Sequence, residues 1–395
     1  MRPLPLTAFS AVTGFGPGLA PLRAALREGR SALAPDTFSR HGHPKGYIAR
    51  LAAADTPAAL LPPALARFAC RAHALLYLAL SADGFAEALA RARARWGAGR
   101  IALVLGTSTS GIIAAEEAYA ARDETGRLPE SFDFAHTQDF AAPARLLAAC
   151  TGIEGPALVL SAACASTAQC FGAAAELIAA GFADAAVVGG ADSLCQMTLA
   201  GFGALGLIAP RPCRPFDRDR EGISIGEGAA LFLLERDGAA PFYLLGYGES
   251  SDGYHMSAPH PEGAGARRAM EAALAAAGLE PEAIDYLNLH GTATPANDAA
   301  EDRAVAALFG PRVTASATKG FTGHTLGAAG AIEAAITLIA LEEGFVPPTL
   351  FHTTPDPALL TPIVTRPESR PLRRAMSNSF GFGGANCSLV LGRAA

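Results

Sequence analysis

The sequence predicts an α/β protein. Short apolar runs alternate with alanine-rich helical runs along the whole chain. Three apolar runs are bounded by glycine, at 100–106, 156–161 and 185–190, and fully apolar strands are typical of a sheet covered on both faces. The run 165–180 reads as a helix that ends at Gly181, where glycine provides a C-cap. Strands and helices that alternate in this way indicate a sheet with helices packed against it.

Size and composition allow a large buried core. The chain has 395 residues, half of them hydrophobic and 17% charged, which favours two lobes of roughly 100–200 residues each. A low content of charge argues against disorder. The formal net charge of −6 creates no global field that attracts nucleic acid or anionic lipid, so neither is an expected partner.

The two halves of the chain share an internal plan. A helical run precedes an apolar run twice, in 67–80 with 101–106 and in 266–278 with 286–291. Small-residue helices also open after Cys164 and after His324, and each is followed by Gly-Phe. We therefore expect a duplicated α/β lobe, with an N-terminal half at 1–238 and a C-terminal half at 239–395.

No segment predicts secretion or a membrane span. The first ten residues lack the apolar core of a secretion signal. The uncharged stretch 155–175 contains proline, hydroxyl and amide side chains and fits a strand plus a helix start better than a span. Seven cysteines without a Cys-x-x-Cys pair indicate neither a zinc site nor a disulfide framework. We expect a cytoplasmic protein without a metal or other cofactor.

Two predicted strand ends carry candidate catalytic residues. Cys164 lies between a strand and a helix, where the helix N-terminus is expected to lower the pKa of a thiol. A small buried cysteine is the alternative there, and it is the role that we expect for Cys170 in mid-helix. His290 ends a strand and begins a tight polar turn, and active sites of open α/β sheets gather at such ends. A histidine that only caps the turn is the alternative.

Two glycine-rich segments complete the set. Lys319 and His324 lie on a loop that feeds a helix containing Glu333. This loop lacks the G-x-x-x-x-G-K-[ST] pattern, so a phosphate cradle is not indicated. The segment 377–386, Ser-Asn-Ser-Phe-Gly-Phe-Gly-Gly-Ala-Asn, joins two predicted strands, and its glycines let the backbone approach a ligand. Its two phenylalanines are core residues or a hydrophobic gate, and an ordinary hairpin is the alternative for the whole segment.

In this order, the motifs resemble the beta-ketoacyl-acyl carrier protein synthases of the decarboxylating, two-histidine type. The matching motifs are Ala-Cys-Ala-Ser, His-Gly-Thr-Ala-Thr-Pro, Thr-Lys-Gly-Phe-Thr-Gly-His-Thr-Leu-Gly-Ala-Ala-Gly and Asn-Ser-Phe-Gly-Phe-Gly-Gly. Arg-Pro-Phe-Asp from Arg214, the glycine-rich run 222–228 and Ser-Asp-Gly-Tyr-His-Met-Ser-Ala-Pro from Ser251 also match. The resemblance covers essentially the whole chain. It implies a thiolase-like fold, a duplicated five-layer αβαβα sandwich that is usually dimeric.

The resemblance implies a role for each central residue. Cys164 accepts an acyl chain from acyl carrier protein, because cysteine is both a nucleophile and a good leaving group. Malonyl-acyl carrier protein then loses carbon dioxide, and the enolate attacks the acyl-cysteine. His290 and His324 donate N–H groups to the enolate oxygen, and neutral imidazoles suffice for this. The backbone N–H groups of Cys164 and Phe382 bind the tetrahedral oxyanion.

Further roles follow from the same match. Lys319 and Glu333 form a charged pair that organises the pocket, with Lys319 as a base the alternative. Thr292 and Thr294 bind the phosphopantetheine amides. The gate between acylation and condensation is assigned to Phe382, with Phe380 beside it.

The chain departs from many relatives at two places. Thr109 stands where they carry a bulkier residue at the floor of the acyl pocket, which suggests a deeper pocket or a polar-ended, polyunsaturated chain. The run 203–207 carries no basic residue where they place one for carrier docking. The pathway, whether fatty acid, polyketide or aryl polyene, stays open.

An acidic carrier protein requires local basic groups on this net-negative chain. Arg67 and Arg71 stand four residues apart on a helix predicted over 63–80, so they are expected to share one face. They match the docking helix of the family, and Arg127 is the third candidate. A pair of solvated surface arginines is the alternative. The expected partners are the carrier protein and either a second copy or a synthase-like subunit.

Three rival functions remain weaker. A non-catalytic chain-length-factor subunit shares the fold but lacks the nucleophile that Cys164 supplies. A thiolase or an initiating synthase places asparagine where this chain has His324. A pure scaffold protein leaves the whole constellation unexplained.

Overall fold

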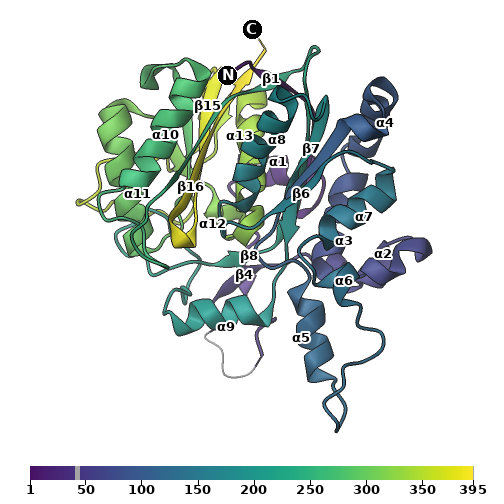
Figure 1. The fold of residues 1–395 in the computed structure, drawn as a ribbon. Coiled ribbons are helices and arrows are strands. Elements are labelled where there is room, and N and C mark those ends of the chain that lie inside the picture. The colour runs from purple at the N-terminus through teal and green to yellow at the C-terminus, as the bar shows by residue number, and fades with distance from the viewer. Residues whose placement is uncertain (41–44, 395) are drawn as a thin grey trace.

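One large mixed sheet dominates the computed structural model, which describes residues 1–40 and 45–394 (Figure 1). Within these residues the sheet has eleven strands in the order β12-β11-β15-β16-β10-β1-β9-β7-β5-β6, with β2 paired to β1. Its strands are β1 (Leu4–Thr13), β2 (Gly16–Pro17), β5 (Ile101–Gly106), β6 (Ala157–Leu160), β7 (Ala185–Asp192), β9 (Gly228–Glu235), β10 (Phe242–Ser251), β11 (Tyr286–Leu289), β12 (Ala315–Ala317), β15 (Arg374–Phe380) and β16 (Ala385–Arg393).

The two halves of this sheet have the same topology. In the N-terminal half the order is β6-β5-β7-β9-β1, and in the C-terminal half it is β12-β11-β15-β16-β10. Both orders run third, second, fourth, fifth, first along the chain of that half. In both, the second strand is parallel to the third and fourth, and the fifth is antiparallel to its neighbours. Antiparallel pairing of β1 with β10 joins the halves. The predicted duplication is therefore confirmed.

Helices cover both outer faces of the sheet and fill the space between its halves (Figure 1). The helices on the N-terminal side are α3 (Arg71–Ser81), α4 (Phe85–Trp96) and α7 (Ala142–Thr151); those on the C-terminal side are α10 (Ala264–Ala277) and α11 (Pro295–Phe309); those between are α8 (Ser166–Ala179) and α13 (Ala329–Glu343). Side chains alternate along β5 accordingly. Leu103 and Leu105 pack under the outer helices, whereas Ala102 and Val104 join the central core. These are the five layers that the resemblance implies.

Small side chains let the two central helices pack closely. A Cβ at Gly330 of α13 would lie 2.8 Å from the Cβ of Ala168 on α8. Contact of this kind excludes larger residues at the crossing. It also places the beginning of α8, next to Cys164, beside the beginning of α13, which follows His324.

The remaining elements range from two-residue strands to a ten-residue helix. They include α1 (Leu19–Glu28), α2 (Pro57–Leu60), α5 (Ile112–Ala120), α6 (Phe134–Thr137), α9 (Gln196–Ala204), α12 (Lys319–Thr322) and the small strands β3 (Ala34–Pro35), β4 (Tyr47–Ala49), β8 (Ile225–Gly226), β13 (Phe345–Val346) and β14 (Glu368–Ser369). Turns of 3₁₀ helix occur at Ala52–Asp55, Pro63–Phe68, Ala98–Arg100, Pro281–Ala283, Gly310–Arg312, Leu326–Ala328 and Phe382–Gly384. Among the described residues, no helix combines the length and the apolar character needed to cross a membrane.

The helix predicted over 63–80 is wrong. The chain forms a 3₁₀ turn at Pro63–Phe68 and starts α3 only at Arg71. Cys70 between them is extended, with φ −147° and ψ 165°, which interrupts the helical hydrogen bonds. Arg67 and Arg71 therefore lie on different elements and share no helix face.

Candidate active site

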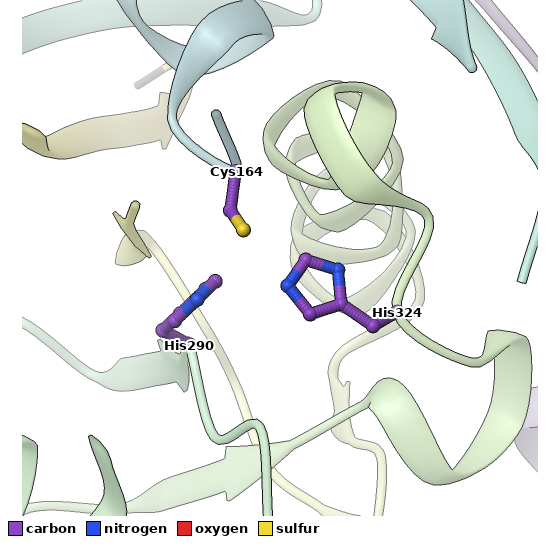
Figure 2. A group of neighbouring side chains, drawn as sticks. All are labelled: Cys164, His290 and His324. Carbon is purple, nitrogen blue, oxygen red and sulfur yellow. The ribbon is translucent and has the colours of Figure 1, made fainter. Parts of the chain in front are cut away.

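Cys164, His290 and His324 meet at one point of the fold, although they are far apart in sequence (Figure 2). Cys164 precedes α8, His290 follows β11, and His324 lies between α12 and α13. The sulfur and one ring nitrogen of each histidine all lie within 4.8 Å of one another. The two imidazole rings are 5.5 Å apart and nearly perpendicular, at 88°. All three side chains are buried.

A strained turn carries Cys164 into this site. Ala163 has φ +47°, a left-handed conformation that costs free energy for a residue other than glycine. Ser166 stabilises the turn, because its hydroxyl accepts the N–H of Ala162 and donates to the carbonyl of Ala163. Gly381 of the β15–β16 hairpin packs against the turn, where a Cβ would lie 2.8 Å from the carbonyl oxygen of Ala162.

The environment of Cys164 differs from the expected one. Burial raises the pKa of the Cys164 thiol to about 11, opposed by the charge of Lys319 and by the backbone N–H of Phe382. Desolvation disfavours the thiolate more strongly than these groups favour it. The expectation of a lowered pKa is therefore wrong, and the resting site holds a neutral thiol at pH 7. The contact with the N–H of Phe382 shows that the hairpin aims a donor at the sulfur.

Lys319 determines which nitrogen of His290 carries the proton. The ammonium of Lys319 is a donor only, and its Nζ lies 3.1 Å from Nδ1 of His290, so Nδ1 accepts. It also donates to the carbonyl of His290 and to the carboxylate of Glu333. The proton of neutral His290 must then sit on Nε2. Burial raises the pKa of Glu333 to about 7, and Lys319 opposes the rise.

His324 has the same tautomer for a different reason. The backbone N–H of Leu326 donates to Nδ1 of His324 at 3.1 Å, which leaves the proton on Nε2. Burial and the charge of Lys319 hold the pKa of both His290 and His324 well below the usual value. Both histidines are therefore neutral at pH 7, and each keeps one N–H free to donate.

A cavity of about 220 Å³ opens onto these three residues. Its lining includes Thr292 and Thr294, whose hydroxyls lie 2.8 Å apart, and both phenylalanines of the β15–β16 hairpin. Phe382 is half-buried and contacts the edge of Phe202 at 5.6 Å between ring centroids, whereas Phe380 is buried and contacts His290. The glycine-rich hairpin thus forms one wall of the cavity.

Thr109 is not among the described residues that line this cavity, so its place at the floor of an acyl pocket stays a prediction. It is buried, and its hydroxyl and its N–H both donate to the carboxylate of Asp192.

The three basic candidates have different environments. Arg71 is buried and pairs with Glu227 and Asp55, so the expectation that it faces a carrier protein is wrong. Its guanidinium stabilises a buried carboxylate instead. Arg67 is exposed and forms a surface ion pair with Asp133, and Arg127 is exposed.

Glu301 is a site residue that the sequence analysis missed. Its two carboxylate oxygens accept the backbone N–H groups of His290 and Gly291 at 2.7 and 2.8 Å. It therefore holds the turn that carries the histidine. The signal was an acidic side chain six residues after the start of α11, in Asn-Asp-Ala-Ala-Glu, which sequence alone does not separate from a surface residue. Burial raises the pKa of Glu301 to about 7.

The same three central side chains are also a donor set that zinc accepts, one thiolate and two imidazoles. However, the ammonium of Lys319 contacts His290 directly, and a second cation beside it would be repelled. The site is better suited to an oxyanion than to a metal ion.

Comparison with known proteins agrees with this geometry. The family model described as "Beta-ketoacyl synthase, N-terminal domain" matches residues 1–240, and the one described as "Beta-ketoacyl synthase, C-terminal domain" matches residues 242–353. The 3-oxoacyl-[acyl-carrier-protein] synthase 2 of Vibrio cholerae is 38% identical over 317 residues, 75% of this chain and 76% of its own length.

Solved structures of this kind share the whole fold. A ketosynthase (ApeO) in complex with its chain length factor (ApeC) from Xenorhabdus doucetiae superposes with a TM-score of 0.91 at 37% identity, over 99% of this chain and 98% of that one. A beta-ketoacyl synthase from Burkholderia phymatum gives 0.86 at 31% identity over 100% of both chains. The chain belongs to the beta-ketoacyl synthase family and is an acyltransferase that forms carbon–carbon bonds.

Proposed function

We propose that Cys164, His290 and His324 carry out a decarboxylative condensation of malonyl-acyl carrier protein with an acyl chain held on Cys164. One observation carries the proposal. Both histidines are neutral and have their Nδ1 atoms occupied, so both present Nε2–H next to the sulfur of Cys164. Two neutral donors beside one nucleophile suit a reaction in which negative charge develops on a thioester oxygen.

Acylation comes first. The sulfur of Cys164 attacks the carbonyl carbon of the acyl thioester, and the new carbon–sulfur bond replaces the bond to the carrier. The proton of the Cys164 thiol ends on the departing phosphopantetheine thiol, so no charge is left over. Backbone N–H groups of Cys164 and Phe382 stabilise the tetrahedral oxyanion, and such a donor is worth about 3–4 kcal/mol.

Condensation follows. The bond between the malonyl carboxylate and the α-carbon breaks, carbon dioxide leaves, and the electron pair forms an enolate. The Nε2–H groups of His290 and His324 donate to its oxygen. The α-carbon then attacks the acyl carbonyl carbon, the carbon–sulfur bond breaks, and Cys164 leaves as a thiolate that takes up a proton from solvent. Lys319 and Glu333 hold His290 in the required tautomer, and the engaged donors of Lys319 argue against its use as a base.

The cavity wall fits a phosphopantetheine arm. Thr292 and Thr294 place hydroxyls in the lining, where they can bond the amides of the arm. Phe382 lines the same cavity and contacts Phe202, which supports its assignment as the gate. We propose that the chain works in the cytoplasm as one half of a pair, with a second copy or with a synthase-like subunit.

One assay tests this function. Purified protein receives malonyl-acyl carrier protein and a panel of acyl-acyl carrier proteins, and mass spectrometry follows the products and the peptide that contains Cys164. We expect carbon dioxide, a 3-oxoacyl product two carbons longer than the primer, and acyl mass on Cys164. A chain-length-factor role predicts no acyl mass on Cys164, whether or not another subunit is present. A thiolase predicts condensation without malonyl groups, which would contradict the proposal.

The exposed arginines provide a test of carrier docking. Arg67→Glu and Arg127→Glu should each raise the Michaelis constant for acyl carrier protein about 2- to 5-fold at low salt, because a solvent-exposed charge contributes about 0.2–1 kcal/mol. The rise should fade as salt screens the charges. Arg93→Glu on α4 serves as the matched control, since Arg93 is bonded to the carbonyl of Thr151. Unchanged carrier kinetics at low salt would remove Arg67 and Arg127 from the docking surface.

A further inference from the structure

Asp192 is a fully buried carboxylate at the end of β7, and all of its hydrogen-bond partners among the described residues are neutral. Six groups donate to its two oxygens at 2.6–3.1 Å, and the N–H of Ser108 is shared between both oxygens. The donors are Thr107 Oγ1, Ser108 N and Oγ, Thr109 N and Oγ1, and Gly327 N. Burial of a carboxylate is costly unless donors replace its water. These hydrogen bonds rigidly join three chain segments, which are the end of β7, the turn 107–109 after β5, and the turn after His324.

One of these segments leads directly to His324. The N–H of Gly327 donates to Asp192 at 2.6 Å, and its carbonyl accepts the hydroxyl of Thr167 at 2.7 Å. The peptide before it supplies the N–H of Leu326 that occupies Nδ1 of His324. Leu326 has φ +55°, so this turn is strained and needs external support.

The other segments lead to the nucleophile. Thr167, which binds the carbonyl of Gly327, belongs to the first turn of α8, three residues after Cys164. The end of β5, just before the turn 107–109, also packs on this helix end, since a Cβ at Gly106 would lie 2.7 Å from the N of Thr167. Gly327 itself admits no side chain, because a Cβ would lie 2.6 Å from Asp192 Oδ2. The turn after His324 is thus held from two sides, by Asp192 through the N–H of Gly327 and by Thr167 of α8 through its carbonyl.

We propose that Asp192 is a positioning residue, whose carboxylate clamps the turn after His324 onto the turn after β5 and so aims Nε2–H of His324 at the substrate oxygen. The proposal rests on the proposed function of His324. In this role Asp192 does not touch the substrate. Loss of its hydrogen bonds should therefore disturb the orientation of His324 more than that of Cys164.

The first test is Asp192→Asn, which keeps the size of the side chain but turns one acceptor into a donor that faces other donors. We expect malonyl decarboxylation to fall about 10- to 100-fold, the range for lost support of a reacting group. The Michaelis constant for malonyl-acyl carrier protein and the rate of Cys164 acylation should change less than 3-fold. Asp302→Asn is the matched control, since Asp302 is also buried and accepts only backbone N–H groups, those of Leu360 and Thr361.

A double-mutant cycle tests the route through His324. In a His324→Ala background, Asp192→Asn should lower decarboxylation no further, because the group that it positions is gone. Additive losses, or equal losses of acylation and decarboxylation, would show a merely structural role and overturn the proposal. Asp192→Glu, which keeps the carboxylate, should recover part of the activity.

If Asp192→Asn does not fold, a milder variant and a second measurement still test the clamp. Ser108→Ala removes a hydroxyl that donates to Asp192 at 2.7 Å, and decarboxylation should fall about 2- to 5-fold at unchanged acylation. Hydrogen exchange of amides 325–328 should be faster in both variants, and unchanged exchange would refute the clamp. If the unmodified protein releases no carbon dioxide, the proposed function is contradicted. The rate of hydrogen exchange at amides 325–328 still tests whether Asp192 clamps this turn.

Discussion

Replacement of Cys164 by alanine is expected to abolish acyl-enzyme formation and to lower condensation on the order of 10³-fold or more, because no other group at the site can hold the acyl chain. The fold should survive, since alanine fits the space of a buried cysteine and the turn at Ala163 is held by Ser166. Intact-protein mass spectrometry after incubation with acyl-acyl carrier protein measures the first effect, and thermal unfolding measures the second.

Cys170→Ala is the matched control for this change. Cys170 is fully buried in α8, and its thiol donates to the carbonyl of Ser166, so its loss should leave acylation intact. Acyl mass on a peptide with Cys170 or Cys195 in place of Cys164 would refute the assignment.

Because burial raises the pKa of the Cys164 thiol to about 11, its alkylation by iodoacetamide should be slow at pH 7 and should accelerate as the pH rises toward that value.

Replacement of either His290 or His324 by alanine should raise the barrier to malonyl decarboxylation by about 2–4 kcal/mol. Each histidine supplies one Nε2–H donor, and loss of that donor leaves the enolate oxygen less stabilised. Acylation of Cys164 should survive better in at least one of the two variants, because the acyl oxyanion is assigned to backbone donors. Carbon dioxide release from malonyl-acyl carrier protein and the acylation rate are measured in parallel.

A buried histidine outside the site provides the control for these variants. His73 lies on α3 and is buried, so His73→Gln should leave the ratio of decarboxylation to acylation unchanged. Undiminished carbon dioxide release in both His290→Ala and His324→Ala would show that neither histidine stabilises the enolate.

The pH profile of decarboxylation adds a second check on the two histidines. Since the pKa of each histidine is lowered well below 6.5, both stay neutral from pH 8 down to about pH 6.5, and protonation of them should cause no loss of decarboxylation in that range.

Local patterns were sufficient for much of the fold. Apolar runs bounded by glycine predicted β5, β6 and β7 to within two residues. β5 and β7 are buried throughout, as expected for strands covered on both faces. β6 is the edge strand of the sheet and is partly exposed, so the expectation of a fully buried strand is wrong there. The helix expected over 165–180 is α8, at Ser166–Ala179. The helix expected over 63–80 is wrong, since 63–68 form a 3₁₀ turn and two extended residues, Ala69 and Cys70, separate that turn from α3.

Sequence by itself determined the fold class, the duplicated plan, the family and the three residues that meet at the site, because strand periodicity and motif order are local properties of the chain. Only the tertiary structure decided the properties that depend on burial and on distant partners. Arg71 is buried and pairs with Glu227, which lies 156 residues away in the sequence. Burial also raises the pKa of Cys164 rather than lowering it. Asp192 likewise became a candidate only when folding brought Gly327, 135 residues away, onto its carboxylate.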